Sequence, residues 1–304
     1  YYGTPENPAP QSPSASGTAF PTLVGNRGLT PEKADTWTAG VVVQSPLSSG
    51  PLSRLRFSAD WFDIRIDNAI GAQTIGAVLQ QCFDPAFNPL VLRDATAAAN
   101  SQFCQLVPRN QTGQLGNVSI TYANSGRVHL QGIDGQLDWA IPVGPGTLNA
   151  NVLVNYLIDF ESSPLSSLPM VDYAGTFGTT ENGLNQGAYE YRVLATLGYG
   201  IGGTRLALQW QHLPSVEDSA EPLTPNATTG APAYNIFNLN GSTELGEMMT
   251  IRFGVDNLFN KAPPRVGIDL NADPSVGQLG GGSFNSTFYD TNGRRFYLGA
   301  NIRF

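Results

Sequence analysis

The chain has 304 residues, with 16 Lys and Arg against 24 Asp and Glu and a formal net charge of −8. Charged residues make up 13% of it, about half the share that soluble globular domains carry, whereas 41% apolar and 10% aromatic residues exclude a mainly disordered chain. The only lysines are Lys33 and Lys261, so the sequence offers no basic patch for a phosphate backbone and argues against nucleic acid as a partner.

Apolar residues recur with a period of two along most of the chain, which is the pattern of strands with one apolar and one polar face. No run reaches the ~18 apolar residues that a membrane-spanning helix needs. The pattern is clearest near residue 304, where the apolar positions are Phe296, Leu298, Ala300, Ile302 and Phe304. The sequence therefore predicts an all-β protein.

The alternation predicts nine strands, and most of them reach the ~9–11 residues that a tilted strand needs to cross a bilayer. In the second strand the apolar phase changes between Trp61 and Phe62, and we interpret this slip as a β-bulge near Trp61 to Asp63. The predicted strands cover residues 33–46, 53–68, 117–141, 146–160, 187–199, 204–213, 233–245, 248–258 and 292–304.

The predicted connections alternate between short and long, which favours a transmembrane antiparallel β-barrel with short turns at one end and long extracellular loops at the other. A soluble β-sandwich is the structural alternative, but its outer face would be charged and its loops would not sort by length. The polar face here is rich in Asn, Gln, Ser, Thr and Gly, which suits a wet lumen. Aromatic residues near the strand ends suit an interfacial girdle, at Trp37, Trp139, Tyr191, Tyr199 and Trp210.

The odd number of strands has a topological consequence. If the last strand ends in the periplasm, residues 1–32 form an extracellular loop segment and residues 33–304 form a portion of a barrel. Nine strands alone would leave two unpaired edges in hydrocarbon. We therefore expect that further strands complete the wall, supplied by an upstream region of the same polypeptide or by a separate chain.

Six segments together resemble the carboxyl-terminal half of the barrel of TonB-dependent outer-membrane receptors. They are residues 25–42, 60–70, 124–139, 234–240, 251–264 and 293–304, ending in GRRFYLGANIRF. The resemblance implies a location among the lipids of the bacterial outer membrane and a 22-stranded barrel around a plug domain. It also implies import of a scarce ligand, such as a siderophore, a vitamin or an oligosaccharide.

The family resemblance also implies partners. TonB would act through a plug domain that these residues do not include, and the barrel-assembly machinery would recognise Phe304 on the last strand. A passive porin-like channel and a structural barrel subunit of an envelope assembly remain alternatives. His129 and His212 lie beside no recognisable nucleophile, so we expect no enzyme, no catalytic residues and no cofactor.

Ligand contacts are expected from lumen-facing and loop residues that can stack on a ring or hydrogen-bond it, namely Tyr173, Phe177, Tyr189, Arg192 and Gln211. Cys82 and Cys104 have no His or Cys-x-x-Cys motif beside them, so we predict a disulfide over two unpaired buried thiols. We predict no metal site. The weak calcium candidate, Asp269, Asn271 and Asp273, has Pro274 where such a loop needs Gly, which favours a solvated loop.

Overall fold

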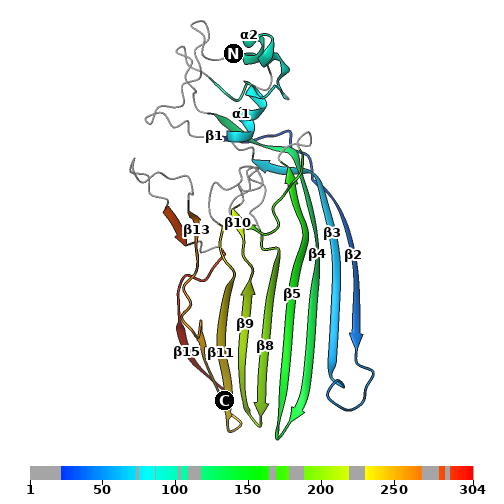
Figure 1. Cartoon of the computed structure of the whole chain (residues 1–304), viewed down its shortest axis with the longest axis vertical. Helices are drawn as coiled ribbons and strands as arrows, with labels where there is room; N and C mark the ends of the chain where they lie inside the picture. The colour runs from blue at the N-terminus through cyan, green and yellow to red at the C-terminus, as the bar shows by residue number, and fades with distance from the viewer. Residues whose placement is uncertain are drawn as a thin grey trace.

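The computed structural model describes residues 22–72, 75–85, 87–101, 104–108, 118–163, 169–177, 188–218, 230–268, 281–284 and 288–303. It shows a tall, twisted wall of strands with helices and short strands gathered at one end (Figure 1). Within these ranges, each helix is too short or too polar to span a membrane.

Nine long strands form the wall among the described residues, and each lies antiparallel beside its neighbour in chain order. This confirms the predicted antiparallel sheet, with strand ends within a few residues of the predicted ones. The wall strands are β2 (Lys33–Gln44), β3 (Leu55–Ala72), β4 (Ser119–Val143), β5 (Gly146–Ser163), β8 (Tyr191–Ile201), β9 (Thr204–Leu213), β11 (Tyr234–Leu245), β12 (Met249–Asp256) and β15 (Arg295–Ile302).

Connections at one end of the wall are tight, and four of them place a glycine at positive φ, where a side chain would be strained. These glycines are Gly50 in the β2–β3 connection, Gly144 in the β4–β5 turn, Gly202 in the β8–β9 turn and Gly246 in the β11–β12 turn. The β2–β3 connection, residues 45–54, lies at the same end (Figure 1). The long connections all lie at the opposite end, as the sequence predicted.

The long connections carry secondary structure of their own. Between β3 and β4 lie three short helices, α1 (Ile75–Phe83), η1 (Pro89–Leu92) and α2 (Ala95–Ala99), which the period-two reading missed. Short strands extend or brace the loop end: β1 (Thr22–Val24) pairs with β4, β6 (Val171–Asp172) with β5, β7 (Thr176–Phe177) with β10 (Glu217–Asp218), and β13 (Arg265–Ile268) with β14 (Gly281–Phe284).

Strand register gathers the apolar side chains on one face. One row crosses six strands as Leu148, Tyr199, Leu206, Gly241, Phe253 and Leu298. Exposure on this face reaches 79% for Leu298 and 73% for Phe296, which would be costly in water but is favourable against lipid. We call this surface the apolar face and the opposite surface the polar face.

The band of the apolar face that would contact lipid, here called the apolar belt, has a height that can be measured along β8. Tyr191 and Tyr199 mark its two ends on the apolar face, with Val193, Ala195 and Leu197 between them. Eight residues of strand rise about 27 Å, close to the ~25 Å belt of outer-membrane barrels once strand tilt is allowed for. All five residues predicted for the aromatic girdle lie on this face by register.

The predicted bulge near Trp61 to Asp63 is wrong. β3 pairs with β4 without a shift from Leu55 to Asp67, and the irregularity comes later, around Asn68 (φ 54°). The hydrophobic phase changes because the surroundings change: Phe62 and apolar residues beyond it face the interior at the loop end. A bulge does occur in β5, where Gln131 pairs with Asp159 and Gly132 with Leu157, leaving Ile158 as the extra residue.

The wall is open. In the part of the chain that the structure describes, β2 and β15 are the two edge strands, each with a single strand neighbour in the sheet. A spanning sheet cannot leave backbone groups unpaired in lipid. The sheet is therefore a portion of a larger barrel.

Candidate functional site

On the polar face, three amide side chains donate hydrogen bonds to two carboxylates of β4. Asn155 Nδ2 donates to Asp134 Oδ1 at 2.7 Å, and Asn151 Nδ2 donates to Asp138 Oδ1 at 2.7 Å. Gln136 Nε2 also donates to Asp138, through Oδ2 at 2.7 Å. These bonds give both carboxylates an amide donor on the water-facing side of the wall.

A cavity of about 460 Å³ lies against β3, β4, β5, β8 and β9, and it is the candidate ligand site. Its centre is one cross-strand row in which Asp60 pairs with Asp134, Asp134 with Asn155, and Asn155 with Arg192. The polar residues that line the cavity are Ser58, Asp60, Asp134, Gln136, Asn155, Arg192 and Gln211.

Several lining groups keep unused hydrogen-bonding capacity. Within the described ranges, the side chains of Asp60, Arg192 and Gln211 make no hydrogen bond or ion pair with other protein groups. Asp60 lies across Gly40, where a Cβ would collide with its carboxylate. An acceptor, a cationic fork and an amide therefore face one wet space, a set that can bind a ligand carrying both hydroxyl and acidic groups.

The five predicted ligand residues fall into two groups. Arg192 and Gln211 line the cavity. Tyr173, Phe177 and Tyr189 are instead buried at the loop end, at 2%, 5% and 7% exposure. Tyr173 packs with Leu157 and Phe160, whereas Phe177 and Tyr189 belong to a second cluster. The sequence missed Asp60, Asp134 and Asn155, because their shared row depends on register.

The second cluster ties three long connections together. Tyr189 Oη donates to the carbonyl oxygen of Phe288 at 2.9 Å, and the two rings lie 5.1 Å apart. Tyr234 meets Tyr289 edge to face at 5.4 Å. Burial raises the pKa of the Tyr189 and Tyr289 hydroxyls, because an ionised phenolate would lose its water. The loops at this end are therefore packed on an aromatic core.

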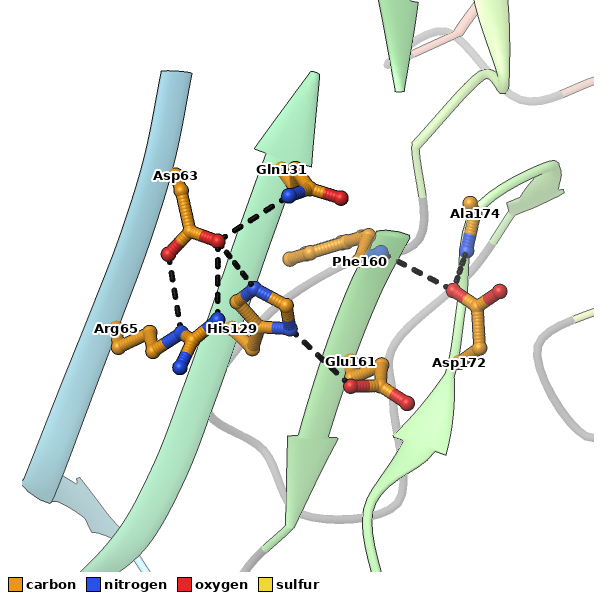
Figure 2. Close-up of polar contacts among 8 residues, drawn as sticks. All are labelled: Asp63, Arg65, His129, Gln131, Phe160, Glu161, Asp172 and Ala174. Atoms are coloured by element: carbon orange, nitrogen blue, oxygen red, sulfur yellow. Dashed lines mark hydrogen bonds and ion pairs between the residues drawn. The ribbon is translucent and has the colours of Figure 1, made fainter. Parts of the chain in front are cut away.

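A polar network continues the apolar face upward on β3, β4 and β5 (Figure 2). Arg65 donates to both carboxylate oxygens of Asp63, at 3.0 and 3.1 Å. His129 places Nε2 3.2 Å from Asp63 and Nδ1 3.2 Å from Glu161, so one ring links three strands. Figure 2 also shows Asp172 anchoring β6, by accepting from the Phe160 and Ala174 amides.

The predicted disulfide is confirmed: Cys82 of α1 and Cys104 are joined, with Cα atoms 4.6 Å apart. The bond lies in a small core with Val78, Val107 and Val118. Asn88 is fully buried beside it and donates to the carbonyl oxygen of Cys82 at 3.0 Å. The disulfide thus joins two points of the β3–β4 connection, and no described residue of that connection lines the polar-face cavity.

Two sets of predicted residues lie outside the described residues. They are the calcium candidates Asp269, Asn271 and Asp273, and Phe304. Among the described residues, His, Cys, Asp and Glu form no group of three placed to hold a metal ion.

An open antiparallel wall with one lipid-facing surface and one polar, cavity-bearing surface defines the class as a portion of a bacterial outer-membrane β-barrel. The sequence matches the family described as "TonB dependent receptor-like, beta-barrel" over residues 1–258. The chain therefore belongs to the TonB-dependent receptor β-barrel family, and it resides in the outer membrane. No curated protein matches it by sequence.

Solved structures share the fold at low sequence identity. A variant of the ferric enterobactin receptor PfeA from Pseudomonas aeruginosa, in complex with enterobactin, aligns with a TM-score of 0.55 and 17% identity over 92% of this chain and 32% of that chain. The outer membrane transporter YddB from Escherichia coli gives 0.51 and 9% over 95% and 35%. The siderophore receptor PirA from Acinetobacter baumannii gives 0.50 and 16% over 93% and 33%. The chain thus spans about one third of these proteins.

Proposed function

We propose that this chain is the carboxyl-terminal wall portion of a TonB-dependent transporter that imports a scarce ligand, such as a siderophore, a vitamin or an oligosaccharide. The observation that carries the proposal is the row from Asp60 to Arg192, which lines a cavity on the polar face and whose two end residues make no side-chain hydrogen bond or ion pair within the described part of the chain. Binding and passage, not bond making, are the chemistry such a site supplies.

The proposal also covers the other parts of the complete transporter. Residues 1–32 would be an extracellular segment and residues 33–304 barrel wall. Other strands and a plug domain, on the same or a separate chain, would close and fill the barrel. TonB would supply energy through the plug, and the barrel-assembly machinery would recognise Phe304. Tyr173, Phe177 and Tyr189 would act by shaping the loops around the entrance, while Arg192 and Gln211 would touch the ligand.

Uptake by cells that carry the complete receptor tests this function. Radiolabelled ferric enterobactin, cyanocobalamin and maltohexaose represent the three ligand classes. One of them should accumulate, should stop accumulating without TonB, and should enter at least ten-fold more slowly in Arg192→Ala, Gln211→Ala. Entry that persists without TonB, with steady conductance in a planar bilayer, would favour the passive channel. Absence of uptake, with stoichiometric recovery of envelope proteins, would favour the structural subunit.

A further inference from the structure

A second pocket on the polar face, of about 330 Å³, lies close to the tight turns and is distinct from the candidate ligand cavity. Register places Arg205 of β9 beside Ser242 of β11, and Ser242 beside Arg252 of β12. Because neighbouring strands lie about 4.8 Å apart, the two arginine Cα atoms are roughly 10 Å apart on one face. Two guanidinium groups can therefore reach the same point above Ser242.

Glycines keep this pocket open. The cross-strand neighbours beyond the two arginines are Gly200 and Gly299, so no side chain crowds either guanidinium from the side. Tyr297 lies across Gly254, where any Cβ would overlap its ring and hydroxyl. The glycine thus allows the phenol to lie flat along the wall and to line the pocket beside Arg252.

The polar side chains that line the pocket are all hydrogen-bond donors, and no carboxylate is among them. The donors are Arg205, Arg252, Asn240, Ser242 and Tyr297. Glu244 lies on the same face of β11, but its carboxylate folds against Gly203 at the turn. In the described part of the chain, neither arginine makes an ion pair or a side-chain hydrogen bond.

A nearby arginine shows the contrast. Arg295 places Nη2 3.0 Å from Asp290 and Nε 3.6 Å from Asp256. Arg205 and Arg252 instead flank Ser242 on the same face with their charges uncompensated, and the Arg205 side chain extends over Gly200. Like charges at this range repel, and an anion between them would turn that repulsion into attraction. A planar carboxylate matches the two-pronged geometry of a guanidinium.

We propose that Arg205, Arg252 and Tyr297 form a carboxylate-binding site, occupied by an acidic side chain of the domain that the complete barrel encloses. This inference rests on the proposed function, which supplies such a domain. The position favours that occupant: Arg205 follows the turn at residues 202–203 directly, far from the loop end where a solute would enter. The wall would thus bind the enclosed domain through Arg205 and Arg252, near the end that carries the tight turns.

Hydrogen exchange on the complete receptor in detergent tests the site. The Arg205→Gln, Arg252→Gln receptor should exchange amides of the enclosed domain at least ten-fold faster than the parent. Arg56→Gln, which removes an exposed cation from the polar face of β3, is the matched control and should change nothing. Tyr297→Phe, which removes one donor and keeps the ring, should give a smaller acceleration and guards against a fold defect in the double variant.

Calorimetric titration with citrate separates the two possible sources of the carboxylate. The titration counts only the citrate binding that Arg205→Gln, Arg252→Gln abolishes, and the parent receptor should show none of it, because the site is filled. Saturable citrate binding that the double variant loses, without faster exchange, would overturn the enclosed occupant in favour of a free solute. No exchange difference and no citrate binding, or an equal effect of Arg56→Gln, would overturn the site itself. If the complete protein encloses no domain, the proposed function fails while the citrate titration still decides whether the anion site exists.

Discussion

Trp61 and Asp63 point to the same face of β3, yet Trp61 belongs to the apolar belt and Asp63 to the polar network of Figure 2. Trp61 lies between Ala39 and Ile133, whereas Asp63 lies between Trp37 and Gln131. The outer boundary of the membrane therefore passes between two successive outward side chains. Above it the same face meets water, and the interior becomes apolar where the loops pack.

A charge placed in the middle of the apolar belt should weaken the receptor. Ala195 lies midway between Tyr191 and Tyr199 on the apolar face, and we expect Ala195→Arg to cost about 2–4 kcal/mol, because the guanidinium would enter hydrocarbon. Folding equilibria in lipid vesicles would measure this. Thr196→Arg, one residue along on the polar face, should cost far less. Equal costs for the two variants would mean that the assignment of the faces is wrong.

Gly254 and Gly299 make a matched pair on two neighbouring strands. Gly254→Ala should destabilise the β12–β15 pairing by about 1–3 kcal/mol, since the added methyl group would displace the Tyr297 ring. Gly299 has no atom within 4 Å of the position a Cβ would take, so Gly299→Ala should be tolerated. Denaturant titration of both variants would test the pair. A Gly299 variant that is the weaker of the two would contradict the packing.

The disulfide should stabilise the helical excursion and leave the wall unaffected. Cys82 and Cys104 are separated by 22 positions, and opening a loop of that size frees about 3 kcal/mol of chain entropy. We expect Cys82→Ser, Cys104→Ser to expose residues 75–108 to protease, with an unchanged shift of the barrel on unheated gels. The reduced parent protein should behave as the double variant does. Loss of the folded barrel band would show that the wall depends on this bond.

The loop cluster should loosen at alkaline pH. Burial raises the pKa of Tyr189 in the folded state, so its stabilising effect is complete below the unfolded value of about 10 and is lost as pH rises above it. Tyr189→Phe should cost about 1 kcal/mol at pH 8, through the lost bond to Phe288, and should flatten the decline in stability above pH 10.

Thermal unfolding at pH 8, 10 and 11.5 would measure both effects of the Tyr189 substitution. Tyr122→Phe serves as the control, because that side chain is exposed. An alkaline decline as steep in the Tyr189 variant as in the parent would assign the transition to other groups.

The wall could be predicted from the sequence because each strand repeats its own pattern. Phe296, Leu298 and Ile302 alternate with polar residues whatever their neighbours are, and short turns then force antiparallel pairing. The α1 helix was not predicted, because it has nine residues and buries only a few side chains, including Val78 and Cys82, in a local core. So short a helix leaves no sustained period of 3.6.

The candidate site was only half predictable. Asp60, Asp134 and Asn155 each fall on a polar face by alternation alone, but their meeting in one row depends on turn lengths and on pairing across three strands. The extra residue Ile158 then shifts the register of β5 relative to β4 beyond that row. Sequence also cannot distinguish a loop tyrosine that stacks on a ligand from one, like Tyr189, that packs on its own loops.

The wall has long connections at one end and tight turns at the other, and the two ends therefore differ in how much change in length the fold tolerates. Lengthening the connection between Asp172 and Tyr191 would leave the ladder pairs of β5 and β8 as they are. One residue added at Gly144 would swap inside and outside for every side chain that follows in β5. The sequence and length of the connections can therefore vary at one rim, while the opposite rim has almost no freedom to vary.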